Sequence, residues 1–371
     1  WSRIAAYKRT AKAAFGGMID LSVGSPVDPV PDSVRKALAV AANDPNAYGY
    51  PATAGTADLR AAIAEWFSAT RNVDLQAIHA DVVPTVGSKE GVALMASLLH
   101  FGEDDVVVQP KVSYPTYEIG TQLAGAQVLK VDDVADVASW RNVPGVKAVW
   151  VNSPCNPTGE VYSAERMAGI VAAAREIGAV VLSDECYALM QWRGATNSAD
   201  DDPLQSTPCA LRSDVCAGSA EGVLVLYSLS KQSNMAGYRT AFIAGDESLI
   251  ASMSAYRKQI GQIIPGPAQA AMAAGLRDLE SVKVQHARYR ERLGVLVSAL
   301  RAYGYCTDMP DGALYVWVRA KSGDCWTDME QLAKIGIIAS PGEFYGAPEC
   351  LRFSATASDE AIASAAERLA R

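Results

Sequence analysis

The sequence lacks the residue patterns that disulfide frameworks and metal sites require. Its seven cysteines are odd in number, widely spread and contain no C-x-x-C motif, and its three histidines lie far apart. The cysteine pattern favours free thiols in a reducing cytoplasm, and the histidine spacing argues against a metal ligand set. We therefore expect a cytoplasmic protein that binds no metal.

Long apolar runs and clusters of basic residues are also missing. The uncharged stretch at residues 259–276 contains Pro265 and Pro267 and is not typical of a membrane span. Residues 1–20 carry basic residues among alanines without a continuous apolar core, so we expect no signal peptide. With a formal net charge of −8, the chain shows no electrostatic footprint for nucleic acid or a membrane surface. Small molecules and further copies of the chain remain as expected partners.

The composition is that of a folded globular protein, with half of the residues apolar and a fifth charged. A chain of 371 residues is too long for one simple core. We place a large domain at residues 31–284, and a smaller α+β domain with an N-terminal arm at residues 1–30 and 285–371.

Apolar, strand-like segments alternate with helical patterns through the large domain. Strands are expected at residues 82–86, 105–109, 127–131, 147–151, 179–183, 223–227 and 240–245. This pattern predicts the α/β class, with a mostly parallel sheet that helices cover on both faces. Sheets of this kind bind ligands at the carboxyl ends of their strands.

Helix signals complete this prediction. Asp32 or Ser33 is expected to cap a helix that ends near Ala42. Further helices are expected over residues 248–303, with one break at residues 265–267.

Outside these elements, the polar segment at residues 192–222 shows no periodicity. It is either a surface loop or a flap near the site, and we favour the surface loop. In the smaller domain, strands at residues 315–318 and 351–354 enclose a helix at residues 328–335.

A lysine with an unusual setting follows the strand at residues 223–227. Ser228 and Ser230 flank Lys231, and Arg239 comes eight residues later. A lysine that is partly withdrawn from water and close to another cation loses proton affinity and becomes a reactive amine. Lys231 is therefore a candidate nucleophile beside an anion-binding arginine.

A second candidate site lies where the strand at residues 82–86 runs into Gly87, Ser88 and Lys89 at the start of a helix. The unpaired N–H groups of a helix start, together with the helix dipole, favour a phosphate there. A plain capped helix is the alternative for this turn.

Two more strands end in polar side chains that are suited to catalysis. Asn156 follows one strand, and Asp184 with Tyr187 follows another. A carboxylate, an amide, a phenol, a lysine and an arginine at one sheet edge match what pyridoxal phosphate (PLP) needs for its ring, its phenolic oxygen, its aldehyde and its phosphate.

These motifs resemble the fold-type I, class I/II aminotransferases, which use PLP. The resemblance covers nearly the whole chain. Within this family, the chain is most similar to bacterial succinyldiaminopimelate transaminases. The motifs that carry it are Leu21-Ser22-Val23-Gly24-Ser25-Pro26, Asn156-Pro157-Thr158-Gly159, Asp184-Glu185-Cys186-Tyr187, Ser228-Leu229-Ser230-Lys231, Arg239 and Leu351-Arg352-Phe353.

The resemblance implies catalytic roles for Lys231, Asp184 and Tyr187. Lys231 would hold PLP as a Schiff base and move the proton at the substrate Cα. Asp184 would pair with the pyridinium nitrogen, while Asn156 and Tyr187 would hydrogen-bond the phenolic oxygen. Tyr114 would stack on the ring, with core packing as its alternative role.

The resemblance also implies how the phosphate and the substrate are bound. Arg352, with Gly24 and Asn156, would bind the substrate α-carboxylate. Tyr48 would reach the phosphate from the neighbouring subunit, which implies a homodimer with shared active sites. The phosphate would lie among Gly87, Ser88, Lys89, Ser228, Ser230 and Arg239. Solvent exposure for Lys89 and turn capping for Ser228 remain the alternatives.

The expected reaction transfers an amino group between glutamate/2-oxoglutarate and N-succinyl-2-amino-6-oxopimelate, in lysine and diaminopimelate biosynthesis. The substrates are then amino acids and 2-oxo acids. A broad-specificity amino-acid aminotransferase and a PLP-dependent carbon–sulfur β-lyase are the alternative enzymes. A non-catalytic PLP-binding sensor domain is the third alternative.

Overall fold

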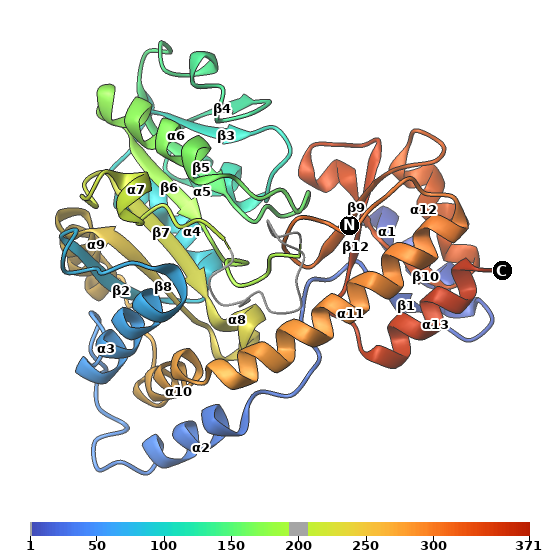
Figure 1. Cartoon of the computed structure of the whole chain (residues 1–371), viewed down its shortest axis with the longest axis horizontal. Coiled ribbons are helices and arrows are strands. Elements are labelled where there is room, and N and C mark those ends of the chain that lie inside the picture. Colours follow the sequence, from blue (N-terminus) through green and yellow to red (C-terminus); the bar gives the residue numbers. More distant parts are fainter. Residues whose placement is uncertain (1, 193–206) are drawn as a thin grey trace.

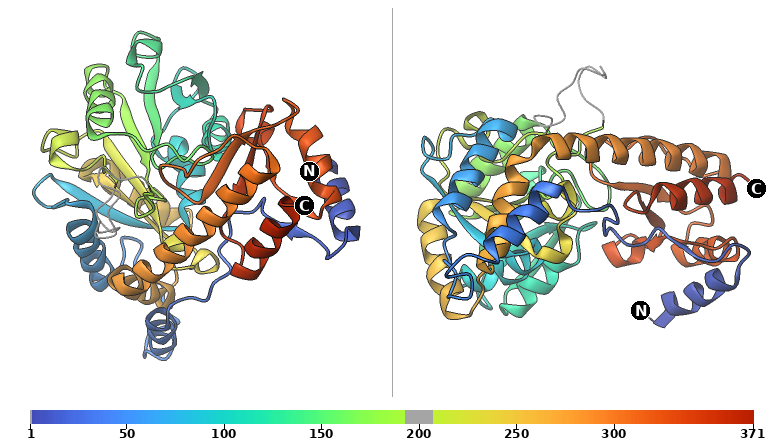
Figure 2. Two further views of the ribbon diagram at one scale, coloured as in Figure 1. Left: turned by 45° about the vertical axis from the view of Figure 1, so that its right-hand side comes forward. Right: turned by 90° about the horizontal axis from the view of Figure 1, so that it is seen from below.

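The computed structural model describes residues 2–192 and 207–371 of the chain. Figure 1 shows a large part built on one sheet and a smaller part that contains both ends of the chain. The long helix α11 (Leu279–Tyr303) runs from the large part into the smaller one. Figure 2 shows it extending along the smaller part, with the N-terminal helix α1 (Ser2–Ala13) at the far end.

The central sheet has seven strands. In spatial order they are β2 (Ala80–Val86), β8 (Thr240–Asp246), β7 (Val223–Ser228), β6 (Val180–Asp184), β5 (Val146–Asn152), β3 (Val106–Pro110) and β4 (Gln127–Val131). The five strands from β7 to β4 pair in parallel. The α/β class and the mostly parallel sheet are thus confirmed.

Helices cover both faces of this sheet because its inner strands are mostly apolar and buried. All residues of β7 are buried, and their side chains alternate between the faces. Leu224 and Leu226 pack with the helices on one face, and Val223 and Val225 with those on the other. The first set is α4 (Ser88–Leu98), α5 (Thr116–Leu123) and α9 (Glu247–Gln259), and the second is α3 (Ala57–Trp66), α6 (Ala164–Glu176) and α10 (Gly266–Arg277).

The smaller part has its own apolar core around an antiparallel sheet in the order β11 (Ser340–Pro341), β12 (Cys350–Ser354) and β9 (Tyr315–Arg319). Strand β1 (Ile19–Asp20) pairs in parallel with β10 (Ile337–Ile338), which attaches the N-terminal arm. The helices are α1, α12 (Cys325–Lys334), α13 (Asp359–Leu369) and most of α11. The two parts have separate apolar cores, and residue 284, at which we propose the division, lies inside α11.

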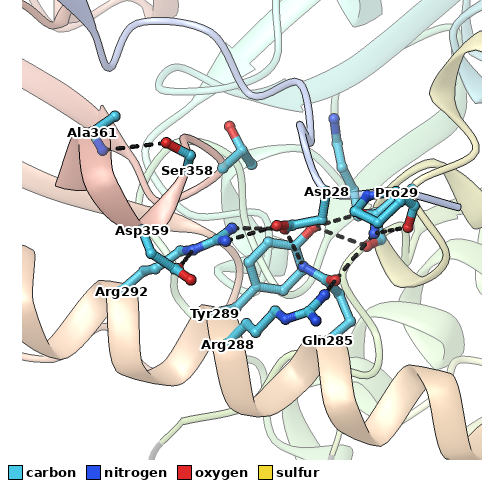
Figure 3. A network of polar contacts seen from close by, with 12 residues as sticks. Asp28, Pro29, Gln285, Arg288, Tyr289, Arg292, Ser358, Asp359 and Ala361 are labelled. Carbon is cyan, nitrogen blue, oxygen red and sulfur yellow. Dashed lines mark hydrogen bonds and ion pairs between the residues drawn. The ribbon is translucent and has the colours of Figure 1, made fainter.

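Polar contacts of α11 reach both parts (Figure 3). The guanidinium of Arg292 donates two hydrogen bonds to Asp28, of 2.7 and 2.8 Å, and a third of 2.6 Å to Asp359. One turn earlier, the hydroxyl of Tyr289 donates to the backbone carbonyl of Lys231 at 3.1 Å. Helix α11 therefore connects the N-terminal arm, the start of α13 and the peptide that carries the candidate lysine.

Strand β8 is antiparallel to both of its neighbours, β2 and β7, which a mostly parallel sheet allows. The expected cap of the helix that begins near residue 32 was wrong. Neither Asp32 nor Ser33 caps α2 (Asp32–Ala41), because Pro31 is the N-cap residue and Ser33 donates to Asp278 instead.

The expected helices also begin and end differently. The 265–267 turn opens α10, and a second break separates it from α11, whose N-cap residue Asp278 accepts a hydrogen bond from the backbone N–H of Ser281. The helix expected from residue 328 begins at Cys325, where Asp324 caps it through Thr327.

The expectation of a surface loop at residues 192–222 is wrong for its second half. Residues 193–206 lie outside the described residues, but Cys209 and Leu211 are fully buried and the short helix α7 (Ser213–Cys216) follows. A buried ion pair explains this. Arg71, in the π-helix Phe67–Arg71, lies 2.8 Å from Glu185 and donates to the Thr207 hydroxyl at 2.7 Å. Glu185 in turn accepts from the Ala210 N–H at 2.8 Å.

No helix in the described part of the chain is both long and apolar enough to cross a membrane.

Candidate active site

A cavity of about 580 Å³ lies at the carboxyl ends of the parallel strands, between the large and the smaller part. All predicted site residues except Gly87 and Tyr48 line it: Gly24, Ser88, Lys89, Tyr114, Asn156, Asp184, Tyr187, Ser228, Ser230, Lys231, Arg239 and Arg352. The structure thus brings together residues that are up to 328 positions apart in the sequence, from Gly24 to Arg352.

The antiparallel direction of β8 places Arg239 in this cavity. Arg239 precedes β8, and Thr240 pairs with Val86, so the start of β8 lies at the edge where β2 ends. Gly87 therefore contacts Arg239, and its N–H donates to the Arg239 carbonyl at 3.0 Å. A Cβ atom on Gly87 would lie 2.0 Å from Nη2 of Arg239, and Gly87 has a φ of +74°. Only glycine fits here without displacing the guanidinium.

The hydroxyl groups beside Lys231 form a small, ordered set. Ser228 is the N-cap residue of α8 (Leu229–Gln232), where its Oγ accepts from the Ser230 N–H at 3.1 Å and donates to the Ser230 hydroxyl at 2.8 Å. Capping by Ser228 is therefore confirmed, although the side chain also lines the cavity. Ser88 begins α4 without a capping side chain, so the first N–H groups of that helix remain available to an anion.

Lys231 lies between the two parts of the molecule. Its ammonium group contacts the backbone carbonyl of Gly24 from the N-terminal arm. Burial lowers the pKa of Lys231, and the charges of Arg352 and Arg239 lower it further. The direction expected from its sequence setting is thus confirmed, and the amine is suited to nucleophilic attack.

Asp184 is buried at the end of β6, where burial raises the pKa of its carboxyl group. Two donors act against this effect. The hydroxyl of Tyr117 donates to Oδ2 at 2.7 Å, and the N–H of Cys186 donates to Oδ1 at 3.2 Å. The Tyr117 ring stacks on Trp150, with 4.5 Å between the ring centroids. Sequence reasoning missed Tyr117, although its position three residues after Tyr114 on one helix start was a usable signal.

Arg352 projects into the cavity from β12. Its guanidinium donates to the Asn156 side-chain oxygen and to the Ser22 carbonyl, each at 2.8 Å. It also lies 4.0 Å from the ring centroid of Tyr315 and 4.8 Å from that of Tyr345. Tyr315 and Tyr345 are two further residues that sequence reasoning missed. Two aromatic faces and two hydrogen bonds hold the planar group in place for a carboxylate.

The hydroxyl groups of Tyr187 and Tyr315 lie 2.6 Å apart in the cavity wall. Gly24 passes close by, since a Cβ atom on it would lie 2.3 Å from the Tyr315 hydroxyl. Gly24 therefore permits a close approach between the backbone of the N-terminal arm and Tyr315.

Lys89, Tyr114 and Tyr48 differ in their position relative to the cavity. Lys89 is exposed and lines the cavity, with its ammonium group 5.8 Å from the centroid of the Tyr114 ring. Tyr114 lines the cavity and also packs against the core, so core packing describes part of its environment, and its stacking on a ring stays a prediction. Tyr48 lies outside the cavity and is 90% exposed.

The donor set of this cavity fits PLP. The start of α4, the serines of α8 and Arg239 offer donors to a phosphate. A Cβ atom at position 87 would displace the Arg239 guanidinium, so only glycine fits there. A buried carboxylate and a lysine with a lowered pKa lie in the same cavity. These are the groups that a PLP site requires.

Comparison with known proteins agrees with this geometry. Residues 16–369 match the family described as aminotransferase class I and II. The chain belongs to this family. Members of this family use PLP, so the protein is a PLP-dependent aminotransferase that acts on amino and 2-oxo acids. Members of this fold are typically dimeric.

Two curated aminotransferases and one solved structure illustrate the relationship. The 4-dedimethylamino-4-oxo-anhydrotetracycline transaminase OxyQ of Streptomyces rimosus is 40% identical over 100% of this chain and 98% of its own length. A probable aminotransferase of Mycobacterium tuberculosis is also 40% identical, over 100% of this chain and 84% of its own. A probable N-succinyldiaminopimelate aminotransferase from Thermus thermophilus superposes with a TM-score of 0.86 at 27% identity, covering 99% and 98% of the two chains.

Proposed function

We propose that this aminotransferase transfers an amino group between glutamate/2-oxoglutarate and N-succinyl-2-amino-6-oxopimelate, as a cytoplasmic homodimer in lysine and diaminopimelate biosynthesis. An excess of positive charge in the cavity carries the proposal. Among the described lining residues the cations are Lys8, Lys89, Lys231, Arg239 and Arg352, and Asp184 is the only carboxylate.

The cavity contains more cations than the cofactor and the substrate α-carboxylate need. In the proposed site, Arg239 meets the phosphate, Arg352 meets the α-carboxylate, and Lys231 carries the cofactor. Lys89 is assigned to the phosphate as well, so Lys8 is left for an additional anionic group of the substrate. The succinylated substrate has such groups, because it carries carboxylates beyond the reacting end. Electrostatic complementarity of this kind contributes to the selection of a ligand.

In the proposed site, the chain's own residues prepare the chemistry. PLP, when bound, supplies an aldehyde for condensation with amines and a protonated ring that withdraws electrons. Lys231 holds the cofactor and moves the proton at the substrate Cα. Asp184 keeps the ring nitrogen protonated, and Asn156 and Tyr187 donate to the phenolic oxygen while Tyr114 covers the ring. The contact between Asn156 and Arg352 links ring binding to carboxylate binding.

The phosphate and the α-carboxylate have separate proposed sites. Arg352 receives the α-carboxylate in a bidentate manner, with Gly24 on the adjacent arm. In a homodimer, Tyr48 of one subunit would donate to the phosphate in the other, which accounts for the exposure of this tyrosine in a single chain. The phosphate is held by Gly87, Ser88, Lys89, Ser228, Ser230 and Arg239.

A second candidate reaction is the amination of a polycyclic ketone. It is favoured by the 40% identity to OxyQ, which is named for a tetracycline intermediate. The names of the relatives favour transamination over the β-lyase reaction, and a non-catalytic sensor would not need a complete set of catalytic groups.

A panel of amino donors and amino acceptors tests the proposal. We would measure kcat/KM for the succinylated substrate, unacylated diaminopimelate, aspartate, aromatic amino acids and a 4-oxo-anhydrotetracycline. A preference of at least about tenfold for the succinylated compound, or roughly 1.4 kcal/mol, supports the assignment. A preference for the polycyclic ketone would establish the second candidate. Equal rates with all amino acids would indicate a broad-specificity enzyme.

A further inference from the structure

We propose that Lys8 of helix α1 binds the second anionic group of the substrate, and that Asp20 and Ser22 hold it at a fixed spacing from Arg352. This inference rests on the proposed function in one respect, namely that the substrate carries an anionic group beyond its α-carboxylate. The N-terminal arm would then bind this anionic group. The sequence motif in this arm had indicated only Gly24 as a substrate-binding residue.

Helix α1 presents one face to the cavity. Ile4 and Lys8 are one turn apart, so their side chains lie on the same side of the helix, and both line the cavity. Residues on a neighbouring side of α1 hold this helix against α12. The Tyr7 ring stacks on Trp326, with centroids 6.0 Å apart, and the Arg3 guanidinium lies 4.4 Å from the Trp326 ring centroid. The cavity face of α1 thus combines an apolar residue with a cation, which suits a carbon chain that ends in a carboxylate.

A continuous chain of hydrogen bonds connects Lys8 to Arg352. The ammonium group of Lys8 lies 2.7 Å from Oδ2 of Asp20. Oδ1 of Asp20 accepts from the N–H of Ser22 at 2.9 Å and from its hydroxyl at 2.5 Å. The carbonyl of Ser22 accepts from Arg352 at 2.8 Å. Asp20 and Ser22 therefore link the two cations, which come from α1 and β12, and set the distance between the two anionic groups that they can bind.

The ion pair with Asp20 leaves Lys8 able to bind a ligand. An ammonium group has three donors, and the pair uses one of them. Asp20 is held by Ser22, and the bonds from Lys8 and Ser22 keep its pKa below the usual value although burial raises it. The Lys8 side chain is 32% exposed, so it is neither buried among protein groups nor free in solvent. Asp20 thus orients the ammonium group toward the cavity, as a positioning residue.

Binding of simple acids to the PLP-loaded enzyme tests this inference, because it needs no turnover. Pimelate and heptanoate have the same number of carbon atoms but two and one carboxylates. By titration calorimetry we expect the unaltered enzyme to bind pimelate more tightly. Lys8→Met should weaken pimelate binding about tenfold, as expected for loss of a charge-assisted hydrogen bond, and leave heptanoate binding unchanged. Lys8→Arg should retain most of the preference.

Lys12→Met is the matched control, because it removes the same charge from an exposed position of the same helix. It should bind both acids as the unaltered enzyme does. If the unaltered enzyme binds both acids equally, the premise of a second anionic group fails, and the proposed function fails with it. If it prefers pimelate and Lys8→Met keeps that preference, the anion is bound elsewhere and this inference is overturned.

Discussion

The hydroxyl of Tyr117 offers a direct way to test how the buried carboxylate is kept ionised. Replacing Tyr117 by Phe removes the 2.7 Å hydrogen bond to Asp184 and retains the ring that stacks on Trp150. Burial raises the pKa of Asp184. Among the groups that lower this pKa, the Tyr117 hydroxyl has the largest effect. Without this donor, Asp184 should hold its proton to a higher pH and stabilise a protonated ring nitrogen less well.

The size of the effect follows from the kind of bond that is lost. A hydrogen bond to a charged group contributes about 1.5–3 kcal/mol, which corresponds to a loss of roughly 10-fold to 150-fold in kcat/KM if it is realised fully in the transition state. The direction in which the pH profile of kcat/KM shifts also follows from the lost hydrogen bond. In the proposed site, activity requires ionised Asp184, so the acid limb of the kcat/KM profile should move to higher pH in Tyr117→Phe.

Tyr305→Phe is a suitable control, because it removes a buried tyrosine–carboxylate bond of 2.8 Å, to Asp328, in the smaller part. It should reduce the free energy of unfolding by a similar amount without moving the acid limb. If Tyr117→Phe shows the same kcat/KM and the same acid limb as the unaltered enzyme, Tyr117 does not support Asp184 and the reasoning is refuted.

Four further predictions concern the cofactor, stability and assembly. Asp184→Asn should keep the fold, by circular dichroism, and lose most activity, so near-normal turnover would remove Asp184 from its role. Gly87→Ala should weaken PLP binding at least about tenfold in a fluorescence titration, because the added Cβ displaces the Arg239 guanidinium that we propose to bind the phosphate. Burial lowers the pKa of His286 to about 4, so thermal stability should fall as the pH drops from about 6.5 to 4, and His286→Phe should flatten that fall. Mixing inactive Tyr48→Phe and Lys231→Ala subunits should restore some activity through heterodimers, whereas an active monomer in light scattering would contradict the shared site.

Much of the fold and of the site could be predicted because its signals are local in sequence. Most of the parallel strands are apolar runs, and parallel strands bring their carboxyl ends to one edge, so Asn156, Asp184 and Lys231 could be placed together. The direction of β8 could not be predicted in this way, since an apolar run reads the same in either direction. Arg239 was nevertheless assigned correctly to the site edge.

The missed residues depend on tertiary contacts that leave little trace in sequence. Tyr315, Tyr345 and Lys8 come from the smaller part, and only packing against the sheet edge brings them to the cavity. The buried second half of the segment at residues 192–222 is polar in composition, and the Arg71–Glu185 pair that holds it joins positions 114 residues apart. Partners at such separations cannot be matched from one sequence, because many arginines and carboxylates would serve equally well.

The central claim is that Lys231 carries the cofactor. Reduction of the purified, PLP-loaded enzyme with borohydride, followed by proteolysis and mass spectrometry, would identify the modified lysine directly. We expect a single pyridoxyl group on the peptide that contains Lys231, and none after Lys231→Ala. Attachment to a different lysine, or no attachment in an enzyme that is active, would contradict this account.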